Sequence, residues 1–283
     1  MKYLITGARG MLGHDIVTAL DGRDVSALDR AELDITDLEA VRKVVPGHDV
    51  IINVAAYTKV DDAEADETRA GLINATGAAN LARAAAENSV ILLQVSTDYV
   101  FDGTATTPYD ENTPRGPVSA YGRTKAEGER LVLELNGERS YIVRTAWLYG
   151  QHGPNFPKTM LQLAAKREAL SVVDDQVGQP TWTMDLARQI VALLDAKAPF
   201  GVYHGTSSGQ TSWYGFAQAV FANAGLDPNR VKPTDSTTFV RPAPRPAYSV
   251  LGHGAWAVAG LAPLRNWEEA LADAMTQGVM ETE

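Results

Sequence analysis

Three regularly spaced glycines near the N-terminus constrain the fold of this chain more than any other feature. They lie in residues 6–13 (TGARGMLG), between a short apolar run and a helical pattern. In this variant of the Rossmann fingerprint, Gly7 permits a tight turn, Gly10 lets the backbone approach a pyrophosphate, and Gly13 allows close helix–strand packing. The N–H groups at the start of the helix attract phosphate. The predicted cofactor contacts of this loop are Gly7, Arg9, Gly10, Met11, Leu12 and Gly13.

The first half of the chain alternates short apolar runs with helical patterns, which is typical of a parallel sheet wrapped by helices. The predicted strands are Tyr3–Thr6, Val25–Leu28, Val50–Val54, Val90–Val95 and Tyr141–Arg144. The predicted helices are Met11–Leu20, Leu38–Val44, Glu67–Glu87 and Ala120–Leu135. Glycines at 71 and 77 weaken the third of these helices. We therefore expect an α/β fold with a Rossmann-type, doubly wound parallel sheet.

Beyond residue 147 the pattern changes to helices separated by loops that contain Pro and Gly. The predicted helices are Phe156–Lys166, Met184–Leu194, Trp213–Ala224 and Trp267–Met275, and the predicted strands are Leu170–Val173 and Gly201–His204. The Pro-rich residues 241–246 are predicted to form a loop. We expect an NAD(P)-binding Rossmann domain at 1–147 and a smaller, interleaved substrate-binding subdomain at 148–283. The helix near 184–195 is expected to fold back onto the first domain.

Charge and composition narrow the classes of function. The net charge of -10 and the pI near 5.0 argue against nucleic acid and anionic membranes as partners. The absence of cysteine excludes disulfides and thiolate chemistry. With no signal-like N-terminal segment and no apolar run of membrane-spanning length, we expect a cytoplasmic protein, monomeric or a homodimer. No two of the five histidines have i, i+4 ligand spacing, so we expect no catalytic metal.

Residues after the second and third strands bear on the choice of cofactor. Asp29 favours NADH because a carboxylate there binds ribose hydroxyls, whereas Arg30 and Arg9 favour NADPH through its 2′-phosphate. We expect NADPH and leave NADH open. Small residues at the end of the third strand would let a ligand lie across it. The further predicted cofactor contacts are Asp29, Arg30, Asp34, Ile35, Ala55, Ala56 and Tyr57.

A threonine, a tyrosine and a lysine form the predicted catalytic group. Tyr121 and Lys125 are four residues apart and share one face of a helix. A free tyrosine has a pKa of about 10, and the neighbouring lysine is expected to lower it toward the range useful for a general acid. Thr97, at the end of the fourth strand, can donate a hydrogen bond to a carbonyl oxygen that becomes an alkoxide. Tyr121 and Lys125 are also predicted to contact the cofactor.

With these residues the chain resembles the extended short-chain dehydrogenase/reductase superfamily and, within it, the family of dTDP-4-dehydrorhamnose reductases. The matching segments include residues 96–103 (STDYVFDG), 121–125 (YGRTK), 144–150 (RTAWLYG), 175–181 (DQVGQPT) and 245–249 (RPAYS). The resemblance implies that hydride from NAD(P)H reduces the C4 ketone of a dTDP-sugar, dTDP-6-deoxy-L-lyxo-4-hexulose. It also implies these substrate contacts: Thr97, Asp98, Val100, Trp147, Asn155, Gln179 and Arg245. Arg245 has a physical case of its own, because a guanidinium binds diphosphate bidentately.

Three alternatives stay open from the sequence. A sugar-nucleotide 4,6-dehydratase or 4-epimerase would share the fold, but a dehydratase needs a second acid beside the threonine, and Asp98 is followed by Tyr99. A 4-ketoreductase of another dTDP-deoxysugar would use the same residues. A non-catalytic, nucleotide-binding regulatory subunit is disfavoured because Tyr121 and Lys125 are both present.

Overall fold

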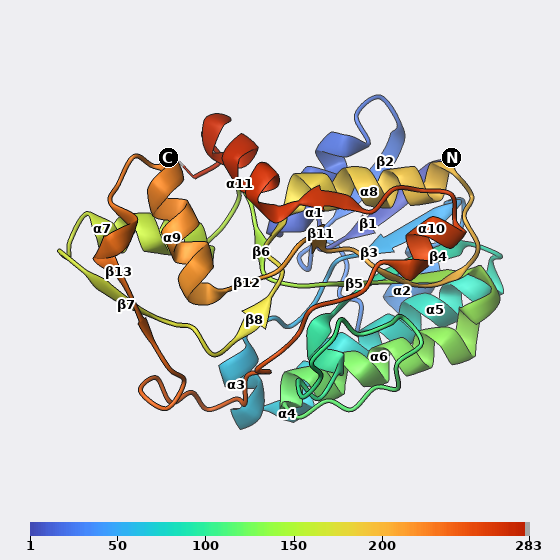
Figure 1. Ribbon diagram of the computed structural model, residues 1–283. Helices are drawn as coiled ribbons and strands as arrows, with labels where there is room; N and C mark the ends of the chain where they lie inside the picture. The colour runs from blue at the N-terminus through green and yellow to red at the C-terminus, as the bar shows by residue number, and fades with distance from the viewer. Residues whose placement is uncertain (281–283) are drawn as a thin grey trace.

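The computed structural model describes residues 1–280 and is built around a six-stranded sheet in the order β10-β5-β4-β3-β1-β2 (Figure 1). The strands are β1 Lys2–Thr6, β2 Asp24–Leu28, β3 Val50–Asn53, β4 Ile91–Thr97, β5 Ser140–Thr145 and β10 Gly201–His204. Every neighbouring pair is parallel. The predicted Rossmann-type fold and its strands are confirmed. The strand order reverses at β1, which lies between β2 and β3, and ligands of such sheets bind beyond the carboxyl ends at this point.

Helices cover both faces of the sheet because alternate strand residues are apolar on each face. On one face, α1 Met11–Ala19 packs beside α8 Thr183–Asp195, and their apolar side chains contact Tyr3 and Ile5 of β1. On the other face, α2 Leu38–Val44, α5 Ala78–Glu87 and α6 Ala120–Asn136 cover Leu4 and Ile51. Figure 1 shows these two helical layers with the sheet between them.

The helix predicted over residues 67–87 is confirmed, but its middle turn is wider than an α-helix. It divides into α4 Glu67–Gly71, a π-helical turn at Leu72–Gly77, and α5. Within the turn, the amide of Asn74 accepts a hydrogen bond from the Tyr57 N–H at 2.8 Å and donates to the Tyr57 carbonyl at 3.1 Å. The wider turn therefore holds the loop that follows β3, which is a recurring use of π-turns near functional sites. A short helix that the periodicity did not indicate, α3 Val60–Ala65, follows the same loop.

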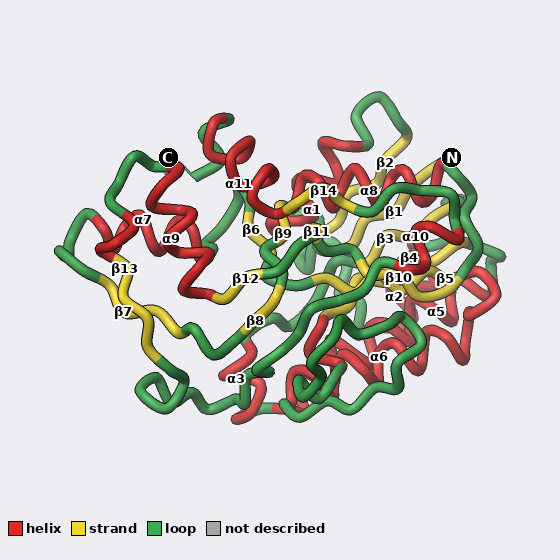
Figure 2. Tube along the Cα trace, viewed as in Figure 1, coloured by secondary structure: helices red, strands yellow, loops and turns green. Residues whose placement is uncertain are grey.

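The second lobe has its own apolar core, to which the helices α7 Phe156–Ala164, α9 Trp213–Asn223 and α11 Trp267–Thr276 contribute. Figure 2 shows these helices in red. The strand β7 Leu170–Val173 pairs in parallel with β13 Val231–Thr234. Shorter pairs are β6 Leu148–Tyr149 with β9 Thr181–Trp182, β8 Val177–Gly178 with β12 Thr211–Ser212, and β11 Ser207–Ser208 with β14 Leu264–Asn266. The helices and strands predicted for this half are confirmed, and residues 241–246 form a loop.

Several segments beyond residue 147 belong to the core of the first lobe. Leu186 of α8, Tyr203 of β10 and Trp256 of α10 Gly254–Val258 pack in the same apolar cluster as β1 and α1. The chain thus crosses between the lobes more than once, and the domain division at residue 147 stays a prediction. Among residues 1–280, no helix combines the length and the apolar character needed to cross a membrane.

Candidate active site

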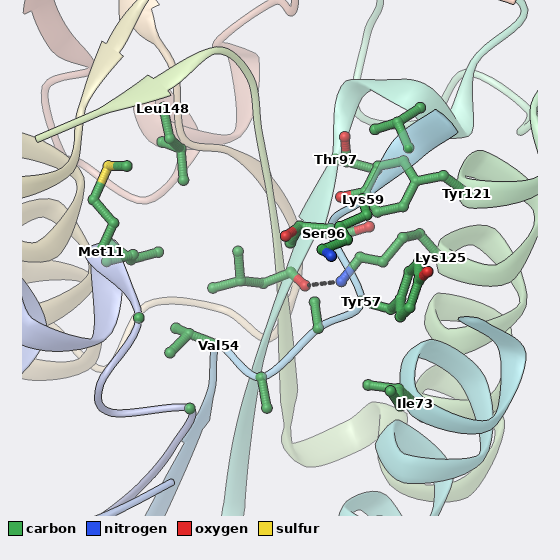
Figure 3. A pocket seen from close by; sticks show the side chains of 18 of the residues that line it. Met11, Val54, Tyr57, Lys59, Ile73, Ser96, Thr97, Tyr121, Lys125 and Leu148 are labelled. Carbon is green, nitrogen blue, oxygen red and sulfur yellow. Dashed lines mark hydrogen bonds between the residues drawn. The ribbon is translucent and has the colours of Figure 1, made fainter. Parts of the chain in front are cut away.

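A cavity of about 1030 Å³ opens at the carboxyl ends of the parallel strands and extends to the second lobe. One end is lined by the glycine loop and by the residues after β2. The other is lined by Thr97, Tyr121 and Lys125, together with Trp147 and Trp213. Figure 3 shows Met11 across the cavity from Tyr121 and Lys125, with Val54 at its floor. The fold therefore brings the predicted cofactor loop and the predicted catalytic group to one site.

The glycine loop has the backbone geometry that a dinucleotide requires. Gly7 has a φ of 76°, and a Cβ added there would lie 2.7 Å from the backbone of Ala55, so only glycine fits. A Cβ at Gly13 would collide with the Gly7 and Ala8 carbonyl groups. The N-cap of α1 is Gly10, which offers no side-chain cap, so the first N–H groups of the helix are free to bind phosphate. These features fit a bound pyrophosphate.

The residues after β2 divide between the cavity and the surface. Asp29 and Arg30 line the cavity, as do Asp34 and Ile35. Arg9 does not line it, because its guanidinium pairs with Glu32 at 2.5 Å on the exposed surface. Arg30 is therefore the predicted phosphate-binding arginine that faces the cavity.

The residues after β3 form the middle of the cavity wall. Ala55, Ala56 and Tyr57 all line it, and their contact with a cofactor stays a prediction. The amide of Asn74 fixes the backbone of Tyr57 and also donates to the Thr124 hydroxyl on α6, at 3.1 Å. This wall is thus tied directly to the helix that carries Tyr121 and Lys125.

The helix α6 presents Tyr121 and Lys125 to the cavity in its first turns. Its N-cap is Ser119, whose hydroxyl accepts a hydrogen bond from the Gly122 N–H at 3.1 Å. The Lys125 amine donates to the Val95 carbonyl of β4 at 2.7 Å, shown by the dashed line in Figure 3. Thr97, two residues further along β4, lines the same region. The predicted catalytic group is therefore assembled, and its roles stay predictions.

The acid–base state of this group differs from the expectation in one respect. Burial raises the pKa of Tyr121 above its ordinary value, against a lowering effect of the Thr97 hydroxyl. Burial also lowers the pKa of Lys125 to about 8, against the opposing charge of Glu129. The expected depression of the tyrosine pKa by the lysine is thus absent, because the amine hydrogen-bonds to a backbone carbonyl and both side chains are desolvated.

Two of the remaining predicted substrate contacts line the cavity. Asp98 follows Thr97 directly, and Trp147 lies between β5 and β6 with a φ of 48°, an uncommon conformation for a bulky residue. The Trp147 ring stacks on that of Trp213 with centroids 3.6 Å apart. The sequence analysis did not predict that Trp213 lines the cavity. The one indication in the sequence was its position at the start of the predicted helix Trp213–Ala224.

The other four predicted substrate contacts lie outside the cavity lining. Val100 is fully buried in an apolar cluster with Phe101. Asn155 caps α7 by accepting from the Lys158 N–H at 3.1 Å. Gln179 is occupied with the backbone of Leu251, and Arg245 pairs with Asp61 at 3.0 Å. Each of the three polar side chains thus has a partner within the chain, and their roles toward substrate stay predictions.

No three His, Asp or Glu side chains within residues 1–280 gather closely enough to hold a metal ion. His14 and His152 stack with ring centroids 4.1 Å apart beside the buried Asp15. Burial raises the pKa of the Asp15 carboxyl.

The fold and the cavity define a Rossmann-type protein of the dinucleotide-binding class. Residues 1–280 match the family described as the RmlD substrate binding domain, and the chain belongs to this family. It is 50% identical over 277 residues to a dTDP-4-keto-6-deoxy-D-glucose reductase of Streptomyces niveus, covering 96% of each chain. It is 49% identical over 280 residues to a dTDP-4-dehydrorhamnose reductase of Streptomyces griseus, covering 96% of this chain and 92% of that one.

A solved structure supports the same family. A dTDP-4-dehydrorhamnose reductase from Bacillus anthracis, in complex with NADP, is 40% identical to this chain and has a TM-score of 0.94. The match covers 98% of this chain and 100% of that one.

Proposed function

We propose that this protein reduces the C4 ketone of a dTDP-linked 6-deoxyhexulose with NADPH. The proposed substrate is dTDP-4-dehydro-L-rhamnose, and the product is dTDP-L-rhamnose. The observation that carries the proposal is that the glycine loop and the group of Thr97, Tyr121 and Lys125 line one cavity. The named relatives that reduce dTDP-sugars support the substrate class.

The cofactor would be held by the chain's own loops. The free N–H groups at the start of α1 would bind the pyrophosphate, and Arg30 would bind the 2′-phosphate that distinguishes NADPH. Bound NADPH supplies a hydride. The Bacillus anthracis relative with NADP supports this choice over NADH.

Tyr121 is the proposed proton donor. Its raised pKa keeps the phenol protonated at neutral pH, so a proton is ready when negative charge develops on the substrate O4. The proton then passes from the Tyr121 oxygen to O4, which completes the alcohol. Lys125 would contact the cofactor, and Thr97 donates a hydrogen bond to O4.

A turnover assay tests the proposal. The protein is incubated with dTDP-4-dehydro-L-rhamnose and either NADPH or NADH, and loss of the reduced nicotinamide absorbance is followed. We expect turnover that is faster with NADPH. No turnover with either cofactor rejects the function, and equal efficiency with both removes the role proposed for Arg30.

A second dTDP-sugar is favoured by one specific observation. The Streptomyces niveus relative, named for dTDP-4-keto-6-deoxy-D-glucose, is as similar to this chain as the relative named for dehydrorhamnose. The assay is therefore run with both keto sugars, and the product is identified by NMR. A higher kcat/KM for the D-gluco substrate replaces the proposed substrate but keeps the reaction.

A further inference from the structure

The carboxyl group of Asp98 is buried beside Thr97 and has no part in the mechanism above. Asp98 is 2% exposed and lies in the short 3-10 turn that follows β4. Its Oδ1 accepts a hydrogen bond from the Thr97 hydroxyl at 2.9 Å. Its Oδ2 is buried and has no hydrogen-bond partner among the described residues. A buried carboxylate oxygen without a donor is costly, and such a group calls for an explanation.

In this structure the Thr97 hydroxyl has no hydrogen left to donate to a substrate oxygen. A threonine hydroxyl has one hydrogen to donate and two lone pairs to accept with. One lone pair accepts from the Tyr99 N–H at 3.3 Å, and the single hydrogen is given to Asp98. To donate to O4, Thr97 must take its hydrogen away from Asp98.

We propose that Asp98 is a positioning residue whose protonation sets the direction of the Thr97 hydrogen bond. When Asp98 carries a proton, its O–H donates to the free lone pair of Thr97, and the Thr97 hydrogen turns to O4. When Asp98 is ionised, it takes the Thr97 hydrogen and the substrate oxygen loses this donor. This proposal rests on the proposed reduction. It adds that the protonation state of Asp98 controls whether Thr97 donates a hydrogen bond to O4.

The surroundings of Asp98 favour a carboxyl group that holds its proton. Burial raises its pKa to about 6, against the lowering effect of the nearby Ser249 and Thr97 hydroxyls. The facing phenols of Tyr99 and Tyr121 stay neutral because burial raises their pKa as well.

The arginine beside Tyr99 is already paired with a carboxylate. The Arg245 guanidinium lies 6.0 Å from the Tyr99 ring and pairs with Asp61. The negative charge of Asp61 offsets the effect of the guanidinium on Asp98. The Asp98 carboxyl group is therefore surrounded by neutral phenols and a paired arginine. Gain or loss of its proton can then change the direction of the Thr97 hydrogen bond.

The pH dependence of kcat/KM tests the proposal, since this quantity reports ionisations of the free enzyme. We expect the wild-type value to be highest below about pH 6 and to fall by up to about tenfold per pH unit above it. The Asp98→Asn variant carries an amide that can donate to Thr97 at every pH. We expect its kcat/KM to lose this fall, so that it no longer depends on pH over this range. Asp102→Asn, at an exposed carboxyl hydrogen-bonded to Tyr109, is the matched control and should keep the wild-type profile.

A second substitution separates positioning from direct substrate binding. Thr97→Val removes the hydroxyl, so adding Asp98→Asn to it should change neither the profile nor kcat. In the presence of Thr97, the effect of Asp98→Asn should appear in kcat and leave KM within about twofold. An unchanged fall in Asp98→Asn, or an effect of equal size with and without Thr97, overturns the proposal.

A titration without substrate makes the two proposals distinguishable. In protein labelled with ¹³C at aspartate carboxyls, the signal lost in Asp98→Asn identifies Asp98. We expect its midpoint near pH 6 and an upward shift in Thr97→Val, because the carboxylate loses a donor. An unshifted midpoint contradicts the coupling. A coupled titration in a protein that fails to reduce either keto sugar supports the coupling and rejects the proposed reduction.

Discussion

The two ends of the cavity are built in different ways. The cofactor end is backbone: glycines whose missing Cβ atoms leave room, and helix N–H groups with no competing cap. The sugar end, named for the proposed substrate, is made of side chains that bind one another. Thr97 binds Asp98 within the cavity, and Arg245 binds Asp61 outside its lining. A backbone site is complete before its ligand arrives. A side-chain site must exchange internal hydrogen bonds for those of the ligand, so small changes there can alter chemistry without altering the fold.

The largest expected effect concerns the support of the sugar end. Arg144 of β5 binds the buried Glu129 of α6 through two hydrogen bonds, at 2.9 and 2.7 Å, and so fixes the helix that carries Tyr121. Arg144→Met leaves a buried carboxylate without this partner and should cost about 3–5 kcal/mol in urea unfolding. Arg130 makes similar pairs with Glu127 and Glu134 on the surface, and Arg130→Met should cost far less, because solvent screens these pairs. Equal losses of unfolding free energy in the two variants would mean that burial does not determine how much these ion pairs contribute to stability.

The next effect tests whether the cofactor end depends on missing Cβ atoms. Gly7 and Gly22 have the same φ of 76°, but a Cβ meets Ala55 at 2.7 Å in the first case and nothing within 4 Å in the second. Gly22→Ala should cost about 1 kcal/mol from the backbone alone. Gly7→Ala should cost roughly 1–3 kcal/mol more from the collision and should weaken NADPH binding. Similar unfolding free energies for the two variants would refute the close-approach argument.

A smaller effect should separate the ligands of the two ends. Arg245→Ala should weaken dTDP-sugar binding by about tenfold and leave NADPH binding within twofold. A hydrogen bond to a charged group contributes about 1.5–3 kcal/mol, and the gain is smaller here because the guanidinium already binds Asp61. Arg30→Ala should do the reverse. Calorimetric titration with each ligand measures both affinities. If either variant lost affinity for both ligands to a similar extent, the two ends of the cavity would not bind separate ligands.

The smallest effect is a pH dependence of stability under the sugar end. Burial lowers the pKa of His204 to about 3, while in the unfolded chain it is about 6.5. The unfolded state alone binds this proton between those values, so the contribution of His204 is complete above pH 6.5 and declines as pH falls. One unit below 6.5 the loss is about 1.4 kcal/mol. Unfolding at pH 7 and about 5.5 should show this loss in wild type, whereas His204→Gln should show less of it.

The same contrast explains how far the sequence predicts this molecule. The glycine loop, the parallel sheet and the Tyr121–Lys125 spacing depend on local pattern, and the structure agrees with the sequence on all three. Pairings such as Gln179 with Leu251 join residues 72 apart in the chain, and no local pattern encodes them. The π-turn at 72–77 was missed because it is stabilised by the bonds of Asn74 to Tyr57, a tertiary contact.

Tyr121→Phe tests the central claim, that the phenol in this cavity protonates the reduced ketone, most directly. The turnover number of the variant with dTDP-4-dehydro-L-rhamnose and NADPH is measured beside that of Tyr141→Phe, whose buried phenol binds the Ala198 carbonyl away from the cavity. We predict a loss of about 10²–10⁴-fold for Tyr121→Phe and wild-type turnover for Tyr141→Phe. Wild-type turnover by folded Tyr121→Phe protein would contradict the account.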